Sequence, residues 1–138
     1  PLIINDRADV ALACGADGVH LGQDDLSVES ARKILGRGAI IGRSCQTLAQ
    51  ARQAVKDGAD YIGFGSVFKT QTKPQRAEMD LKLLQQVIEE IRIPVFAIGG
   101  IDTNNIGCLR AIGVEKIAVT RAISRAKNIG NVVKILKH

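Results

Sequence analysis

The chain has 138 residues and a formal charge of +5 at neutral pH, from 19 Lys and Arg against 14 Asp and Glu. Its apolar fraction of 46% excludes a disordered chain and supports one domain with a buried core, whereas its 3% aromatic content leaves little for stacking nucleic-acid bases. The excess of positive charge favours small anionic ligands such as phosphate esters.

Six apolar stretches of strand length recur along the chain, each followed by a polar or glycine-rich patch; they are residues 2–4, 18–21, 39–42, 61–64, 95–98 and 116–119. Amphipathic stretches of helical length lie between or after them, at residues 9–14, 27–35, 47–56, 80–91, 103–112 and 129–136. Strands that are apolar on both faces are typical of a parallel sheet covered by helices. The chain is therefore predicted to be an α/β protein of repeated βα units.

Cysteine content and the chain ends bear on where the protein works. Three cysteines, an odd number without metal-binding spacing, indicate reduced thiols in a cytoplasmic protein. No apolar run reaches the roughly 18 residues of a membrane span, so we expect neither a membrane nor nucleic acid as a partner, and leave a homo-oligomer open. The chain starts at Pro1 without a signal-peptide pattern, and we expect it to be an internal part of a longer protein.

Polar residues directly follow the first two predicted strands. Ligands of parallel α/β sheets bind beyond the carboxyl ends of the strands, so residues at these ends are the first candidates for a site. Asn5 and Asp6 follow the first strand, and Asp25 closely follows the second. Two carboxylates at neighbouring strand ends can hold one Mg²⁺ ion. Alternatively, Asp25 caps the next helix and Asp6 pairs with Arg7, and both interpretations stay open.

The third and fourth strands are followed by hydroxyl and ammonium groups. Ser44 comes after the third strand, where its hydroxyl suits a phosphate oxygen or caps the following helix. Thr70, Thr72 and Lys73 lie in an irregular stretch at 69–79 after the fourth strand. Two hydroxyls beside an ammonium form either an anion clamp or a solvated loop, and long loops of this kind are often active-site lids.

The last two strands end in groups that suit a phosphate. Gly100 belongs to a glycine pair that brings the backbone close to a ligand or simply allows a tight turn, and Thr120 and Arg121 follow the last strand. His20 lies inside a strand and is interpreted as a hydrogen-bonded structural residue rather than a base. Cys45 has no obvious partner base and is not interpreted as a nucleophile.

Taken together, these motifs resemble the thiamine phosphate synthase family; the matching segments, in order and spacing, are residues 4–7, 20–25, 42–44, 70–73 and 97–101. The resemblance implies a TIM (β/α)8 barrel. The first two strands of the family have no counterpart here, so we expect residues 1–138 to form a single partial barrel domain of six βα units, equivalent to strands three to eight. Ser66 stands where the family often has Pro, and Arg121 where many members have Ser.

The resemblance also implies an enzyme, a transferase that joins 4-amino-2-methyl-5-hydroxymethylpyrimidine diphosphate to hydroxyethylthiazole phosphate and releases pyrophosphate. It implies these roles: Asn5 binds the pyrimidine substrate, Asp6 and Asp25 hold Mg²⁺, Ser44 and Lys73 contact the diphosphate as the catalytic pair, Thr70 and Thr72 approach the thiazole phosphate, and Gly100 with the backbone around Thr120 cups that phosphate. By its position after the last strand, Arg121 is expected to complete the same phosphate site.

Two other functions stay open at this point. A thiazole tautomerase of the same superfamily would bind the thiazole phosphate alone, although Asp6 and Asp25 argue against it because an isomerase needs no Mg²⁺–diphosphate site. A non-catalytic remnant would keep the residues that bind the thiazole phosphate. It would lack the end of the family's second strand, which binds the pyrimidine diphosphate, and this fragment would then be inactive.

Overall fold

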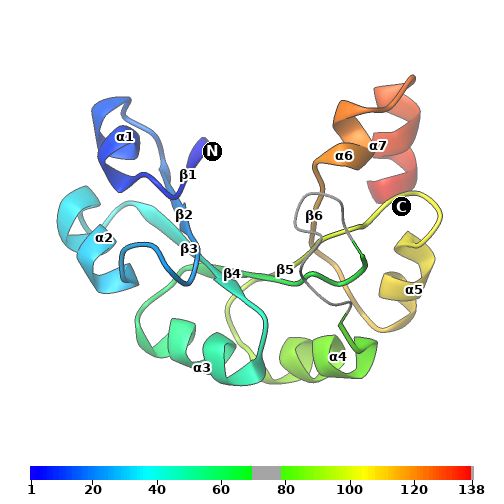
Figure 1. The fold of residues 1–138 in the computed structure, drawn as a ribbon, viewed down its shortest axis with the longest axis horizontal. Coiled ribbons are helices and arrows are strands. Elements are labelled where there is room, and N and C mark those ends of the chain that lie inside the picture. Colours follow the sequence, from blue (N-terminus) through cyan, green and yellow to red (C-terminus); the bar gives the residue numbers. More distant parts are fainter. Residues whose placement is uncertain (70–78, 138) are drawn as a thin grey trace.

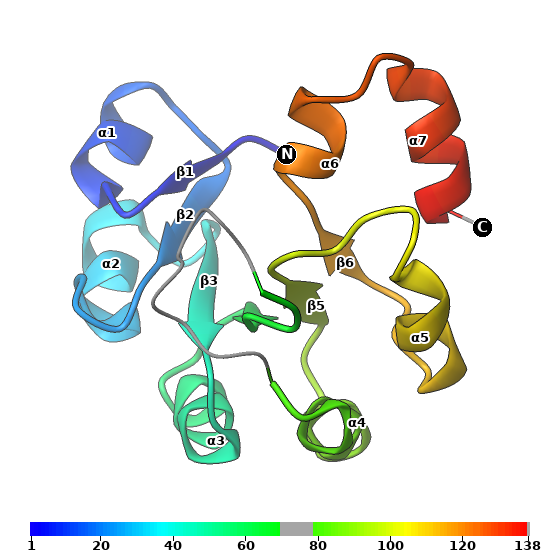
Figure 2. The ribbon, with the colours of Figure 1, turned by 45° about the vertical axis from the view of Figure 1, so that its right-hand side comes forward.

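The computed structural model describes residues 1–69 and 79–137, which form one six-stranded sheet in the order β1-β2-β3-β4-β5-β6. The strands are β1 (Ile3–Asn5), β2 (Gly18–Leu21), β3 (Ile40–Cys45), β4 (Tyr61–Phe64), β5 (Val95–Ile98) and β6 (Ile117–Ala118). Each strand pairs in parallel with the next. The sheet curls, and the helices cover its outer side (Figures 1 and 2). The carboxyl ends of all six strands therefore meet at one edge.

Seven helices lie in the described part of the chain: α1 (Ala8–Ala13), α2 (Val28–Leu35), α3 (Leu48–Lys56), α4 (Leu81–Glu90), α5 (Ile106–Ala111), α6 (Arg121–Ser124) and α7 (Ile129–Lys137). Local chemistry sets several of their starts. Ser27 accepts a hydrogen bond from the backbone N–H of Ser30, and Thr47 forms a capping box with Gln50. None of these helices has the length and hydropathy that crossing a membrane requires.

The hydrophobic core lies between the sheet and the helices. Successive side chains of a strand point to opposite faces, and the outward positions Val19, Leu21, Ile41, Ile62 and Phe64 are fully buried. They meet a layer of apolar helix residues that includes Ala31, Ala51, Leu84, Val87 and Leu109. The inward positions are consequently not needed for the core, and this leaves the concave face of the sheet for polar groups.

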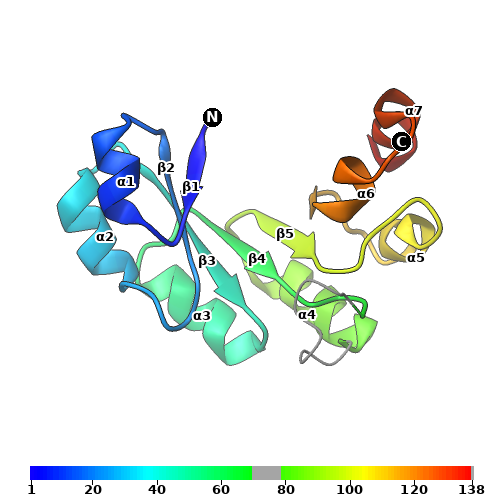
Figure 3. The same ribbon diagram turned by 45° about the horizontal axis from the view of Figure 1, so that its top comes forward.

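The predicted elements agree with the structure to within a few residues, with two corrections. Helix α5 begins at Ile106 rather than at residue 103, because residues 102–105 form a turn in which Asn105 Oδ1 accepts from the N–H of Asp102. The short helix α6 was not predicted, since four residues after a strand carry no helical periodicity. Figure 3 shows how α6 and α7 follow the last strand, away from β1.

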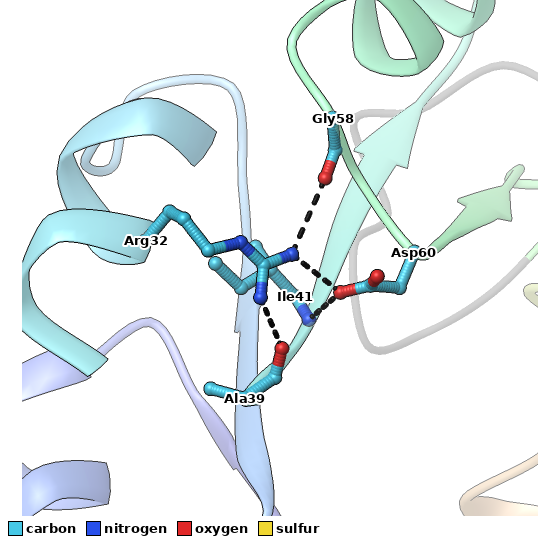
Figure 4. Close-up of polar contacts among 5 residues, drawn as sticks. All are labelled: Arg32, Ala39, Ile41, Gly58 and Asp60. Atoms are coloured by element: carbon cyan, nitrogen blue, oxygen red, sulfur yellow. Dashed lines mark hydrogen bonds and ion pairs between the residues drawn. The ribbon is translucent and has the colours of Figure 1, made fainter. Parts of the chain in front are cut away.

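An ion pair at the amino ends of β3 and β4 ties the sheet to helix α2 (Figure 4). Asp60 Oδ2 accepts from the N–H of Ile41 at 2.7 Å and from Arg32 Nη2 at 2.7 Å. The same guanidinium donates to the carbonyl oxygens of Ala39 and Gly58. The helix, the start of β3 and the turn before β4 are therefore held by one carboxylate and one guanidinium, far from the carboxyl edge.

Replacement of Asp60 by Ala should lower the free energy of unfolding by about 1–3 kcal/mol, because the N–H of Ile41 and the guanidinium of Arg32 lose their shared acceptor. Urea unfolding followed by circular dichroism measures this change. The matched control is Asp9→Ala, which breaks the exposed ion pair with Arg7 and should barely move the midpoint. Equal midpoints for the two variants would contradict the role of Asp60.

Candidate functional site

A cavity of about 640 Å³ opens at the carboxyl edge of the sheet. All six strands or the segments that follow them supply its polar lining: Asn5, His20, Ser44, Ser66, Lys69, Asp102, Thr120 and Arg121. Five residues predicted from the sequence, Asn5, Ser44, Gly100, Thr120 and Arg121, therefore line one space. The structure brings together residues that lie up to 116 positions apart in the chain, as expected for the ends of parallel strands.

Three polar side chains are linked across the concave face. His20 Nδ1 lies 2.9 Å from the hydroxyl of Tyr61, and His20 Nε2 lies 2.9 Å from Ser44 Oγ. Gln23 Nε2 also donates to the carbonyl oxygen of Ser44 at 2.6 Å. Both ring nitrogens of His20 are thus in hydrogen-bond contact, which confirms the interpretation of this residue as hydrogen-bonded. The sequence did not indicate that it lines the cavity as well.

Two glycines make room for the rings of this network. Strand register places His20, Gly42 and Tyr61 side by side. A Cβ atom on Gly42 would lie 2.1 Å from Tyr61 Cζ and 2.5 Å from His20 Nδ1, and one on Gly63 would lie 3.2 Å from His20 Cε1. The ring of Tyr61 also meets Phe96 edge-on, with ring centroids 5.4 Å apart. The rings are therefore confined on several sides.

The turn after β5 borders the other half of the cavity. Gly99 and Gly100 have φ values of +103° and +66°, which favour glycine. A Cβ atom would lie 2.2 Å from Ser66 Oγ at Gly99 and 2.6 Å from the carbonyl oxygen of Lys69 at Gly100. Asn105 Nδ2 donates to the carbonyl oxygen of Gly100 at 2.8 Å and holds the turn. Steric crowding thus requires glycine at both positions, and the backbone of the same two residues lines the cavity.

Charged groups at this end give the cavity a mixed but largely cationic lining. Among the residues that the structure describes, Lys69 and Arg121 line it beside one carboxylate, that of Asp102. Sequence reasoning missed Lys69, although a lysine at the start of the irregular stretch was an available signal. It also missed the hydroxyl of Ser66, whose residue is 7% exposed and lines the cavity.

The predicted metal ligands follow the two adjacent strands β1 and β2. Asp6 has a φ of +63°, a conformation that Asp tolerates better than most residues, and its N–H donates to the carbonyl oxygen of His20. Asp25 Oδ2 accepts from the N–H of Gly22 at 2.6 Å. Helix α2 takes Ser27 as its cap, so the alternative that Asp25 caps this helix is wrong. Neither carboxylate is among the described residues that line the cavity.

Four residues considered in the sequence analysis remain: three predicted site residues, and Cys45, which was not interpreted as a nucleophile. Thr70, Thr72 and Lys73 lie outside the described residues. Cys45 is buried, and desolvation raises the pKa of its thiol to about 11. The thiol is therefore protonated at neutral pH, in agreement with the expectation that Cys45 is not a nucleophile.

Comparison with known proteins shows the family to which the chain belongs. A family model described as Thiamine monophosphate synthase matches residues 1–123. The chain belongs to the thiamine monophosphate synthase family. The thiamine-phosphate synthase of Gloeobacter violaceus is 52% identical over 128 residues, which are 93% of this chain and 38% of that protein. The thiamine-phosphate synthase of Alkaliphilus oremlandii is 44% identical over 137 residues, which are 99% of this chain and 66% of that protein.

A solved structure supports the same membership of the thiamine monophosphate synthase family. The thiamine phosphate pyrophosphorylase from Pyrococcus furiosus superposes with a TM-score of 0.86 at 41% identity, covering 98% of this chain and 64% of that one. The curled six-stranded sheet thus confirms the expected fold class, that of the TIM barrel family. The chain spans less than two thirds of the length of these three relatives.

Substitution of Gly42 by Ala should lower stability by about 1–3 kcal/mol, because the new methyl group would overlap the rings of Tyr61 and His20. Tyr61 is the one tyrosine in a chain without tryptophan, so intrinsic fluorescence reports on its surroundings directly and should change as well.

The matched control for this substitution is Gly107→Ala in helix α5, where an added Cβ atom meets nothing within 4 Å. It should leave the fluorescence unchanged and raise stability by about 0.5–1 kcal/mol, since alanine is the better helix former. A Gly42→Ala protein with native fluorescence and native stability would show that the rings are not confined as described.

Proposed function

We propose that this chain carries the catalytic cavity of a thiamine-phosphate synthase, a transferase that forms thiamine phosphate and pyrophosphate from 4-amino-2-methyl-5-hydroxymethylpyrimidine diphosphate and hydroxyethylthiazole phosphate. Family membership supports the proposal. The observation that carries it is that one cavity joins candidates for both substrates, Asn5 and Ser44 for the pyrimidine diphosphate at one end and Gly100, Thr120 and Arg121 for the thiazole phosphate at the other. A reaction between two phosphorylated substrates needs such a shared space.

The pyrimidine diphosphate is assigned to the half of the cavity formed by β1 and β3. The side chain of Asn5 offers a donor and an acceptor to the aminopyrimidine. The hydroxyl of Ser44 and the ammonium of Lys73 are assigned to the diphosphate, where charge accumulates as the bond to carbon breaks. One such preorganised donor contributes roughly 3 kcal/mol to lowering the barrier.

Asp6 and Asp25 are assigned to Mg²⁺, and the chemistry of the donor set fits this ion. Mg²⁺ takes one or two carboxylates and completes its shell with water and substrate phosphates. No group of three or more His, Cys, Asp or Glu gathers in the described ranges 1–69 and 79–137. When bound, the ion would neutralise the leaving diphosphate.

The thiazole phosphate is assigned to the half of the cavity formed by β5 and β6. The amides near Gly99 and Gly100 and the residues Thr120 and Arg121 border this end. Barrel enzymes commonly bind a phosphate between the loops after their last two strands and a short extra helix, which is the position of α6 here. Thr70 and Thr72 are assigned to the same phosphate, and Lys69, which lines the cavity, adds a cation.

The reaction breaks the bond between the pyrimidine methylene carbon and the diphosphate oxygen, and the electron pair leaves with pyrophosphate. The electron-rich aminopyrimidine stabilises the methylene cation. The thiazole nitrogen then donates its lone pair to that carbon and forms the new bond. No proton has to be removed from the nucleophile, which agrees with a cavity in which His20 is held by hydrogen-bond contacts at both nitrogens.

The kind of substrate and the cellular compartment belong to the same proposal. The substrates are small phosphorylated molecules, and the three free cysteines suit a reducing compartment such as the cytoplasm. Pyrimidine diphosphate and thiazole phosphate should both bind, whereas a tautomerase would bind the thiazole phosphate alone.

The proposal is tested by calorimetric titration of the chain with each substrate, with and without Mg²⁺. Pyrimidine diphosphate should bind at least tenfold more tightly with Mg²⁺, because the ion bridges the substrate and the two carboxylates. Thiazole phosphate should bind equally well in both conditions. Mixing both substrates should release pyrophosphate, which a coupled enzymatic assay detects.

Asp25→Asn is the informative variant, since the amide keeps an acceptor for the N–H of Gly22 and removes the charge. It should abolish the effect of Mg²⁺ on pyrimidine diphosphate binding. Asp24→Asn is the matched control, because the exposed neighbouring carboxylate loses the same charge and should keep that effect. An unchanged Mg²⁺ effect in Asp25→Asn, or binding of thiazole phosphate alone by the native chain, would contradict the proposed function.

A further inference from the structure

The hydrogen-bonded row of Tyr61, His20 and Ser44 has a direction, and that direction decides what Ser44 can offer a ligand. The row crosses the concave face from β4 through β2 to β3, with 2.9 Å at each contact. A neutral imidazole has one N–H and one bare nitrogen. The two hydrogen bonds must therefore run the same way, from Tyr61 through His20 to Ser44 or in reverse.

The acidities of the two hydroxyls favour the first direction. A phenol is a stronger acid than an aliphatic alcohol and hence the better donor to the bare nitrogen of an imidazole. Burial raises the pKa of Tyr61, so its hydroxyl keeps its hydrogen at neutral pH. Because Gly42 has no side chain, the phenol of Tyr61 has room beside His20. Tyr61 then donates to Nδ1, and Nε2–H donates to Ser44 Oγ.

We propose that Tyr61 and His20 are positioning residues that make Ser44 a hydrogen-bond donor toward the diphosphate of the substrate. With one lone pair of Ser44 Oγ engaged by His20 Nε2–H, the hydrogen of this hydroxyl is left for the cavity that Ser44 lines. In the reverse direction Ser44 would give its hydrogen to His20 and present only lone pairs to an anion. This inference rests on the proposed function, because it takes a phosphoryl oxygen as the acceptor.

The surroundings of Ser44 suit such a fixed donor. Gln23 Nε2 holds the carbonyl oxygen of Ser44 at 2.6 Å, and Arg43 Nη1 donates to the carbonyl oxygen of Leu26 in the same loop. The backbone that carries the hydroxyl is thus anchored on the side of β2. A donor whose orientation is set before the substrate arrives stabilises developing charge without a further rearrangement.

The tautomer of His20 tests the direction without any ligand. Two-dimensional ¹⁵N–¹H NMR of the imidazoles, at mildly alkaline pH, distinguishes the Nε2–H from the Nδ1–H form. The chain has two histidines, and comparison with His20→Gln assigns the signals of His20. The Nε2–H tautomer is expected in the native chain. The Nδ1–H tautomer would overturn the inference.

A double-mutant cycle tests whether Tyr61 acts through Ser44. The probe is inorganic pyrophosphate with Mg²⁺, titrated by calorimetry. Tyr61→Phe removes the phenol hydroxyl and keeps the ring, and should weaken binding about tenfold, as should Ser44→Ala. In the Ser44→Ala background Tyr61→Phe should have no further effect. Additive losses would overturn the inference, because a merely structural role of Tyr61 does not depend on Ser44.

Phe96→Leu provides the matched control, since it removes the ring contact to Tyr61 and leaves the hydroxyl in place. Pyrophosphate affinity should stay within about twofold of the native value; a loss as large as that of Tyr61→Phe would overturn the inference. A native chain that does not bind pyrophosphate would overturn the proposed function and the inference together. Normal binding with an Nδ1–H tautomer would overturn the inference alone.

Discussion

The register between neighbouring parallel strands is the constraint on which the rest of the structure depends. It sets Asn5, His20, Gly42 and Tyr61 side by side across four strands. Because side chains alternate along a strand, the same register turns apolar residues such as Ile62 outward into the core under the helices. Polar residues on the concave face therefore serve the cavity without weakening the core. A shift of one residue in any strand would exchange the two faces.

Backbone conformation builds one half of the cavity and side chains build the other. At the β5 end, Gly99 and Gly100 adopt positive φ values and pass close to the segment that carries Ser66. At the β3 end, Ser44 is held by hydrogen-bond contacts from His20 and Gln23. This division suits a reaction in which one phosphate is only bound, and the other, as a diphosphate, has to accumulate charge and leave.

Most of the fold could be predicted because the sequence features that mark its helices and strands lie within a few residues of one another. Ser27 and Thr47 mark helix starts by chemistry that lies within three residues, and each strand ends in a polar patch that identifies the ligand edge. The contact between His20 and Tyr61 joins residues 41 positions apart and follows from strand register, which composition does not reveal. Helix α6 is too short for a periodic signal. Asn5, Ser44, Gly100, Thr120 and Arg121 could thus be placed at the cavity from their positions after strands, whereas the hydrogen bonds of His20 could not be predicted. Asp6 and Asp25 do not line the cavity, and their role stays a prediction.

The central claim is that the carboxyl-edge cavity binds both phosphorylated substrates, each at its own end. Amide chemical-shift mapping of the ¹⁵N-labelled chain tests this most directly, with inorganic pyrophosphate plus Mg²⁺ and hydroxyethylthiazole phosphate added separately. We predict that pyrophosphate shifts the amides around Asn5, Asp25 and Ser44, and that thiazole phosphate shifts those of Gly100 and Thr120. Shifts that gather at the amino ends of the strands, or the same shifts for both ligands, would contradict the claim.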